Sequence, residues 1–437
     1  MSTNKGRRSQ AVILATLLLF LAAACRSSDE TETSAGTTTP GATTAPGDTT
    51  AGETTAPSAA GPVGQGVTDT EIKIGMSIPL SGPLAVSGAL SKGVAAVFNQ
   101  VNAEGGIDGR QIKFVVLDDA YDPSRAASNQ RQLAEQEKVF ASFQFGAPAL
   151  ATRDYMETRK VAQFAFAGNV PLSDTDAYQY TRSLWPDVRL EMGLVTQHIL
   201  KEDPDAKVGI LGLNNDFTSS VIEGVEAGLG DKKDQLVAIE KYEPGAPELS
   251  GQVNKLRAAG VTALATTLQG PSAKAVEYIR QIGWEVPIYN YSNSTSKLAF
   301  LDLIPASAAT GVRQARWFRD PADPALKDDA GMKEYREIIA EFGDGANPDD
   351  ALVINGFGLG QAVLVALQNM AEPTPEALIE SWDNLPPTPS PALPKGVEFK
   401  PVLGGRVVSS YEIVEWDGTT WKSLEPVKDA IGEGFID

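Results

Sequence analysis

The sequence predicts an α/β protein with two doubly wound parallel-sheet lobes, joined by a hinge that the chain crosses several times. The first reason is that short apolar runs alternate with amphipathic segments of helical period from about residue 70 onward. This alternation favours parallel sheets that are covered by helices on both faces. The second reason is length, because about 370 residues follow a low-complexity N-terminal region and one core rarely serves so many.

The first lobe is expected to begin with strand, helix, strand and helix. Isoleucine and methionine alternate over residues 72–78, which predicts a strand, and apolar residues at helical spacing over 94–101 predict a helix. The run at 112–117 predicts the second strand. Asp122 and Pro123 then supply an N-cap and a first-turn proline for the next helix. Two further strands are expected at Val139–Phe143 and Val161–Phe166, with a helix at Ala149–Arg159 between them.

A second set of alternating elements begins after Trp185-Pro186. Helices are expected at residues 188–200, 219–228, 249–259 and 273–282, and strands at 207–213, 235–242 and 263–267. Long helical segments follow at 332–342 and 351–370, and the tail over 397–421 returns to short strands.

This order of elements divides the chain between the lobes. We assign residues 67–186 and 320–400 to the N-terminal lobe, and residues 187–319 and 401–437 to the C-terminal lobe. Two doubly wound lobes that exchange chain in this way place a ligand crevice between them, at the carboxyl ends of their strands.

The first 24 residues have the organisation of an export signal. Three basic residues precede an apolar run over residues 11–24, which is too short for a convincing membrane span. Cys25, the only cysteine, follows Leu-Ala-Ala-Ala, which resembles a bacterial lipobox although Leu21 lies four positions before the cysteine instead of three. We therefore predict a signal peptide over 1–24 and a lipid on Cys25; an ordinary signal peptidase cut is the alternative.

Residues 25–66 are expected to form the lipid anchor and a disordered tether. The stretch is rich in Thr, Ala, Gly, Pro and Ser and has no apolar periodicity, so it cannot bury enough surface to offset the ordering of its backbone. A plain spacer is the preferred interpretation, and an O-glycosylated stalk is the alternative. The folded part is thereby expected outside the cytoplasm, anchored to the cell membrane through Cys25.

Charge and cysteine content exclude several kinds of partner. The formal net charge of −19 becomes −22 once the three basic residues of 1–24 are removed. Nucleic acid and anionic lipid surfaces are therefore not expected as partners. With a single cysteine, no internal disulfide can form.

The sequence offers almost nothing for catalysis. His198 is the only histidine and lies within an amphipathic helical segment, which favours a packing or surface role over that of a base. Asp118 and Asp119 follow a strand, but neighbouring strand residues point to opposite faces, so a loop or hinge role is expected. No nucleotide-binding motif and no cluster of metal ligands is visible. We expect no enzyme activity, no cofactor and no metal site.

Four segments of the folded part carry a resemblance to a known family. They are Ile72–Gly75 (IKIG), Pro79–Pro83 (PLSGP), Asn102–Gly109 (NAEGGIDG) and Asp118–Pro123 (DDAYDP). In this order they resemble the solute-binding proteins of branched-chain amino-acid-type ABC importers, which have the type I periplasmic binding fold. The resemblance covers residues 70–437 and implies a monomer that closes two lobes around a small ligand. It also implies an ABC permease and ATPase as partners, with the membrane reached only through the lipid anchor.

The resemblance also implies where the ligand lies. In the first lobe it points to Ser81 and Ser87 on the loop entering the first long helix, and to two segments after the third and fourth strands. In these segments relatives hold the ligand carboxylate with hydroxyls and backbone amides. In the second lobe it points to a stacking aromatic ring and to two later loops. The implied ligand-binding residues are Ser81, Ser87, Phe145, Gly146, Ala147, Ala167, Asn169, Phe217, Gln269 and Ser292.

Two departures from the family pattern bear on the ligand. Relatives often place an aromatic ring where Ser87 stands, and an acid that pairs with the ligand ammonium where Ser292 stands. Asp216 is a possible replacement for that acid, but a helix N-cap is its preferred interpretation. Tyr121 and Gln144 stand where some relatives have a disulfide. Since an ammonium group then lacks a buried partner, a neutral amide, a carboxylate or an aromatic acid is as well supported as leucine.

The sequence thus predicts an extracytoplasmic solute-binding lipoprotein that captures an amino acid, an amide or a small carboxylate and delivers it to an ABC importer. A ligand-sensing receptor of a signalling system remains the alternative. A cell-wall enzyme is disfavoured by the missing nucleophile, base and metal ligands.

Overall fold

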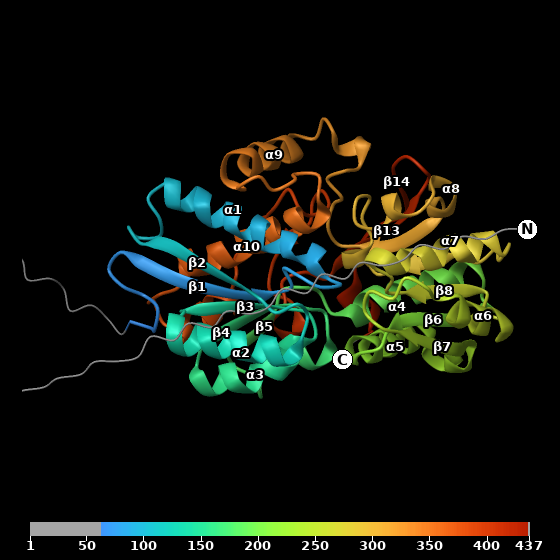
Figure 1. The fold of residues 1–437 in the computed structure, drawn as a ribbon, viewed down its shortest axis with the longest axis horizontal. Coiled ribbons are helices and arrows are strands. Elements are labelled where there is room, and N and C mark those ends of the chain that lie inside the picture. The colour runs from blue at the N-terminus through green and yellow to red at the C-terminus, as the bar shows by residue number, and fades with distance from the viewer. Residues whose placement is uncertain (1–62, 436–437) are drawn as a thin grey trace, which may run out of the picture. The chain divides into compact units, whose positions relative to one another are not determined.

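The computed structural model describes residues 63–435, which contain two main sheets (Figure 1). The first sheet has five strands in the order β2-β1-β3-β4-β5, and all its pairings are parallel. Its strands are β1 (Glu71–Ile78), β2 (Gln111–Asp118), β3 (Ala141–Phe145), β4 (Ala162–Phe166) and β5 (Thr181–Ser183).

Helices cover both faces of this first sheet, as Figure 1 shows. On one face lie α1 (Ala89–Ala103) and α10 (Ala351–Asn369), and on the other lie α2 (Pro123–Gln132) and α3 (Pro148–Arg159). Side chains of a strand alternate between faces. Ile72, Ile74, Met76 and Ile78 therefore share the large core that contains α1 and α10, whereas Val115 and Leu117 of β2 pack with Leu133 and Met156 on the other face.

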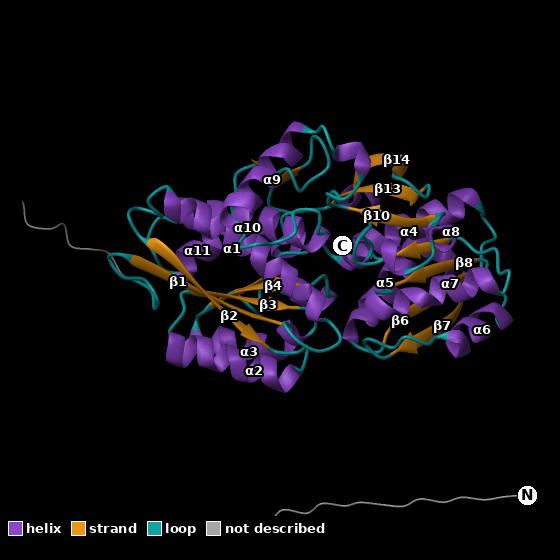
Figure 2. Ribbon diagram, turned by 45° about the horizontal axis from the view of Figure 1, so that its top comes forward, coloured by secondary structure: helices purple, strands orange, loops and turns teal. Residues whose placement is uncertain are grey.

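The second sheet has seven strands in the order β14-β13-β10-β9-β8-β6-β7. Strands β6 to β10 are parallel, and β13 and β14 add an antiparallel edge, which Figure 2 shows beside β10. Its strands are β6 (Val208–Leu213), β7 (Leu236–Tyr242), β8 (Ala263–Thr266), β9 (Ile288–Asn290), β10 (Val312–Arg316), β13 (Ser410–Trp416) and β14 (Trp421–Asp429).

The second sheet is also covered on both faces. Val208 and Ile210 of β6 pack into the core that includes α4 (Val188–Glu202) and α5 (Asp216–Leu229). Leu211 and Leu213 pack with α6 (Ser250–Ala258) and α7 (Lys274–Gln281). The predicted fold class of two doubly wound parallel-sheet lobes is thus confirmed.

The chain crosses between the two sheets three times: after β5, after β10 and before β13. Between the second and third crossings it forms α9 (Ala330–Phe342), α10, α11 (Pro375–Asp383) and the small ladder of β11 (Thr388–Pro389) and β12 (Glu398–Phe399). Helices α9 and α10 pack on α1 of the first lobe. The residue boundaries assigned to the lobes stay a prediction.

The structure corrects the predicted tether at its end. The Gly64 amide donates to the Pro373 carbonyl at 2.6 Å, and the Gln65 side chain donates to the Ala134 carbonyl at 2.9 Å. Residues 64–66 therefore belong to the folded body, because their backbone and side-chain polar groups find partners in it. The predicted signal peptide over 1–24, Cys25 and the tether up to residue 62 lie outside the described residues.

Helix α10 is the one described helix that is long and apolar enough to cross a bilayer, but it is a core helix. Fourteen of its nineteen residues are buried. It passes so close to α1 that glycines stand at the contact. A Cβ added to Gly93 of α1 would lie 2.0 Å from the Val353 carbonyl oxygen, and one added to Gly356 of α10 would lie 2.1 Å from the Leu90 carbonyl oxygen.

We expect Gly93→Ala to lower the free energy of unfolding by about 3 kcal/mol, because the clash between the new methyl group and α10 can be relieved only if the two helix backbones move apart. Urea unfolding followed by circular dichroism measures this change. The control is Gly251→Ala in α6, where no atom lies within 4 Å of the added carbon. Ala there is expected to stabilise by about 0.5 kcal/mol. Equal unfolding midpoints for the two variants would contradict the close approach.

Candidate functional site

A cavity lies where loops at the carboxyl ends of strands from both lobes meet. Its empty space is about 750 Å³, including the part that is open to solvent. The first lobe contributes loops that follow β1 to β5, and the second lobe contributes loops that follow β6, β8 and β9. The lining residues are Leu84, Val86, Ser87, Tyr121, Phe145–Ala147, Ala167–Asn169, Trp185, Leu213, Asn215, Phe217, Thr267, Gln269, Gly270, Tyr291, Asn293, Ser294, Ala299 and Leu352.

Most of the residues predicted from the sequence are brought together here. Eight of the ten line the cavity: Ser87, Phe145, Gly146, Ala147, Ala167, Asn169, Phe217 and Gln269. Their contact with a ligand stays a prediction. Several other lining side chains were not predicted from the sequence, namely Tyr121, Trp185, Asn215, Thr267, Tyr291, Asn293 and Ser294. Trp185-Pro186 was visible as a break between elements, but nothing local shows that a residue after a three-residue strand faces a cleft.

Ser81 does not line the cavity. Ser81 is exposed, and its hydroxyl donates to Asp118 Oδ2 at 2.6 Å. The backbone amides of Leu80 and Ser81 donate to the other oxygen of the same carboxylate. These hydrogen bonds, led by that from the Ser81 hydroxyl, hold the pKa of Asp118 well below its usual range. Ser81 therefore fixes the loop after β1, and Asp118 has the loop role that the sequence predicted.

Ser292 does not line the cavity either. Ser292 is fully buried beside the cavity, and its amide and hydroxyl each donate to one carboxyl oxygen of Glu191, both at 2.7 Å. The inferred lack of a buried acid near this loop is therefore incorrect. Burial raises the pKa of Glu191 to about 8, although both hydrogen bonds from Ser292 oppose the rise. An acid inside the apolar helical pattern of α4 was the only local signal for this group.

Asp216 is not the N-cap of α5. The cap is Asn215, whose side-chain oxygen accepts from the Phe217 amide at 3.1 Å. Asp216 is the first residue of the helix and is exposed, and it does not line the cavity. Helix α5 begins at Asp216, three residues before the helix expected at 219–228, and Asn215 lines the cavity.

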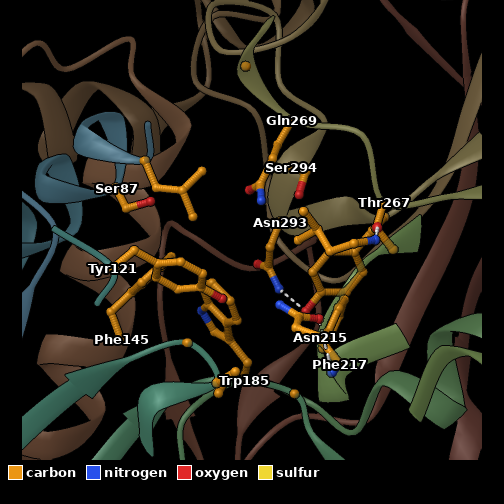
Figure 3. A pocket seen from close by; sticks show the side chains of 18 of the residues that line it. Ser87, Tyr121, Phe145, Trp185, Asn215, Phe217, Thr267, Gln269, Asn293 and Ser294 are labelled. Atoms are coloured by element: carbon orange, nitrogen blue, oxygen red, sulfur yellow. Dashed lines mark hydrogen bonds between the residues drawn. The ribbon is translucent and has the colours of Figure 1, made fainter. Parts of the chain in front are cut away.

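Aromatic rings form the walls of the cavity (Figure 3). On the first lobe, the Tyr121 and Phe145 rings are 5.9 Å apart, and the Phe145 and Trp185 rings are 5.8 Å apart, both edge to face. Across the cavity, the Phe217 ring lies 4.9 Å from that of Tyr291. Gly146 makes room for this wall, since a Cβ there would lie 2.7 Å from the Tyr121 ring.

The polar lining is uncharged. None of the residues that line the cavity is Asp, Glu, Lys, Arg or His. Asn293 is already engaged, since it donates to the Tyr291 hydroxyl at 2.7 Å and accepts from Asn355 at 3.3 Å. Asn169 differs, because it is 1 % exposed and its Nδ2 has no hydrogen-bond partner among the described residues. An unpaired buried donor in a cavity wall is the kind of group that a ligand satisfies.

Charged side chains lie directly behind the residues that line the cavity. Arg406 is fully buried at the third crossing and donates to two cavity-lining carbonyls, Trp185 O at 3.1 Å and Asn169 O at 2.9 Å. Its guanidinium lies 3.6 Å from Asp187, which also pairs with Arg189 at 2.9 Å. Burial alone would raise the pKa of Asp187, but Arg406 and Arg189 outweigh it and the pKa is lowered.

Among the described residues, the histidine and the buried Asp119 do not form a catalytic set at the cavity. The single histidine, His198, is buried away from the cavity and its Nδ1 lies 2.7 Å from Glu425 Oε1, which is a packing role. Asp119 is buried and accepts from the Ser77 hydroxyl and from Gln144. Over residues 63–435, no group of three His, Cys, Asp or Glu side chains is placed to hold a metal ion.

Comparison with known proteins agrees with this geometry. A family model described as periplasmic binding protein matches residues 71–420. The chain therefore belongs to the periplasmic binding protein family.

Individual proteins that match the chain share a quarter or less of its residues. The Leu/Ile/Val-binding protein homolog 1 of Brucella abortus (strain 2308) is 25% identical over 341 residues, which cover 76% of this chain and 85% of that protein. A branched chain amino acid ABC transporter protein from Thermus thermophilus, solved with bound valine, has a TM-score of 0.73 at 16% identity, over 83% of this chain and 97% of that one. The fatty acid ABC transporter substrate-binding protein from Thermomonospora curvata has a TM-score of 0.70 at 22% identity, over 84% and 95% of the two chains.

The buried Glu191 gives stability a pH dependence. Above about pH 4.5 the unfolded chain releases this proton, whereas the folded protein keeps it until about pH 8. The unfolded state then binds fewer protons, so this contribution to stability is complete below pH 4.5 and is lost as the pH rises to about 8. The slope is roughly 1.4 kcal/mol for each pH unit over which only the unfolded chain releases the proton.

We expect Glu191→Gln, which mimics the protonated acid, to remove this slope, so that wild type loses stability relative to the variant between pH 5 and pH 8. Urea unfolding at a series of pH values measures the difference. Glu341→Gln, on the exposed side of α9, is the matched control and should follow wild type. A parallel course of wild type and Glu191→Gln across the whole range would show that Glu191 is ionised in the folded protein.

Proposed function

We propose that this protein is an extracytoplasmic solute receptor that captures a small organic ligand between its lobes and delivers it to an ABC importer. The observation that carries the proposal is the aromatic-lined cavity at the carboxyl ends of the strands of both lobes. The ligand classes are an amino acid, an amide or a small carboxylate. The names of the relatives, which refer to Leu/Ile/Val binding, bound valine and a fatty acid transporter, support transport of a small solute.

Capture works by closure of the two lobes. Contacts already join them near the cavity: Asn355 of α10 donates to Asn293, and the Val170 amide donates to Ser220 of α5 at 3.1 Å. At the rim, a Cβ on Gly245 of the second lobe would lie 2.7 Å from Pro83 of the first. A ligand that touches both walls stabilises this arrangement over an open one by its differential affinity for the two states.

The partners follow from this role. An ABC permease and its ATPase receive the ligand, and the protein reaches the membrane through a lipid on Cys25, after removal of a signal peptide over 1–24. The second candidate function is a ligand-sensing receptor. Ligand-dependent uptake by vesicles that carry the permease and ATPase supports transport, whereas binding without uptake supports sensing.

Ligand capture is testable through stability and fluorescence. A compound present at one hundred times its Kd raises the free energy of unfolding by about 2.7 kcal/mol, so a thermal-shift screen of amino acids, amides, aromatic acids and short peptides should yield a rise in Tm. The same compound should change tryptophan fluorescence, because Trp185 alone among the six tryptophans lines the cavity.

Trp185→Phe is expected to abolish the fluorescence change and to retain a rise in Tm. Trp284→Phe, which is half-buried outside the cavity, should keep both responses. If Trp185→Phe still shows the full fluorescence change, the ligand binds elsewhere.

The lipid anchor is testable by fractionation. Cys25→Ser removes the only thiol that can carry a thioether-linked lipid, so the protein should move from the membrane fraction to the soluble fraction of an expressing bacterium. Ser27→Ala serves as the neighbouring control and should stay with the membranes. Retention of Cys25→Ser in the membrane fraction would mean that another segment anchors the chain.

A further inference from the structure

We propose that the ligand of this cavity carries a carboxylate and no ammonium group, on an aromatic or branched aliphatic body. This inference rests on the proposed function and narrows its ligand class. It follows from three features of the site: an uncharged lining, an excess of positive charge behind its Trp185 and Asn169 end, and donors without partners at that end of the cavity.

An ammonium group would find no counter-charge in the closed cavity. No lining side chain is acidic. The nearest acids along α4 are both occupied, since Asp187 pairs with Arg189 and Arg406, and both oxygens of Glu191 accept from Ser292. A buried cation without a paired anion loses its hydration with little in return, so an amino acid is disfavoured relative to the same skeleton without its amine.

At the Trp185 and Asn169 end of the cavity, the charges behind the lining sum to a positive value, whereas the buried carboxyl of Asp119, whose pKa burial raises, lies behind Tyr121 and accepts a hydrogen bond from its amide. The guanidinium groups of Arg189 and Arg406 share the single carboxylate of Asp187. Glu191 does not cancel the excess at neutral pH, because burial raises its pKa to about 8. Arg406 reaches the lining itself through the carbonyls of Trp185 and Asn169. In a low-dielectric interior this charge attracts an anion and repels a cation.

Donors for the anion lie on the first-lobe side. Asn169 Nδ2 is buried without a partner, and the amides of Gly168 and Asn169 have no hydrogen bond within residues 63–435. The N-terminus of α3, a helix of twelve residues, lies at Ala147 in the same wall; its Ala149 and Leu150 amides donate to the carbonyls of Gly146 and Ala147, so it contributes through the helix dipole. Oriented amides and a helix N-terminus together favour a carboxylate oxygen.

The other lining residues are aromatic and aliphatic, and they indicate the kind of apolar group that the ligand carries. Tyr121, Phe145 and Trp185 face Phe217 across the cavity (Figure 3). Tyr291 packs against Phe217, and the lining also includes the aliphatic side chains of Leu213 and Leu352. Such a surface stabilises a ring or a branched alkyl group by burial and by edge-to-face contact.

The test uses two matched trios and the full-length chain. Calorimetric titration compares 4-methylpentanoate, its amide and leucine, and then 3-phenylpropanoate, its amide and phenylalanine. The members of each trio share one carbon skeleton: the amide replaces the carboxylate by a neutral group, and the amino acid adds an ammonium group beside the carboxylate. We expect at least one of the two acids to bind at least tenfold tighter than its amino acid and its amide.

A charge variant gives a second measurement that does not depend on the absolute affinity. Asn215→Asp adds an anion to the lining and keeps the cap of α5, because Asp caps helices as well as Asn. It should weaken the acid at least tenfold and the amide less than threefold. Asn254→Asp adds the same charge on exposed α6, away from the cavity, and should leave both affinities within twofold of wild type.

The outcomes separate this inference from the proposed function. Tighter binding of leucine or phenylalanine than of the acids overturns the inference and leaves ligand capture standing, as does an amide that equals its acid. Equal loss of acid and amide binding in Asn215→Asp also overturns it. If none of the six compounds binds, the result also contradicts the proposed function, which is the capture of a small aliphatic or aromatic solute.

Discussion

Asp187 and Arg406 form the buried ion pair on which the arrangement of the two lobes depends. Asp187 follows the first crossing between the sheets, and Arg406 lies at the third, so their contact ties together segments that are 219 residues apart in the chain. Arg406 is also satisfied by the carbonyls of Trp185 and Asn169 and by the Ser173 hydroxyl. Removal of either partner would leave a buried charge unpaired, which costs far more than the pair contributes.

The same pair links the hinge to the cavity. Because Arg406 holds the carbonyls of two lining residues, the positions of Trp185 and Asn169 are set by the crossings and not by their own loops alone. The lining is uncharged, and positive charge is in excess behind Trp185 and Asn169. This separation keeps the cavity free of ion pairs that a ligand would have to break, and it lets the protein select ligand charge through the field of buried groups.

Helix positions and long strands could be predicted because their hydrophobic periods are local. Alternation of apolar residues predicted β1 and β2, and helical spacing predicted α1 and α10, all of which the structure contains. The short strands β5 and β9 and the strand β10 were missed. Three residues cannot display a period, and such strands exist because neighbouring strands supply their hydrogen bonds.

The sequence by itself determined the fold class, because hydrophobic periods are local, and its resemblance to relatives pointed to eight uncharged residues that line the cavity. Tertiary structure alone decided that Ser81 turns to Asp118, that Ser292 turns to Glu191, and that Tyr121 and Trp185 face the cavity. The direction in which a loop side chain points depends on partners from distant segments. Glu191 lies 101 positions from Ser292, and no local pattern of residues encodes that contact.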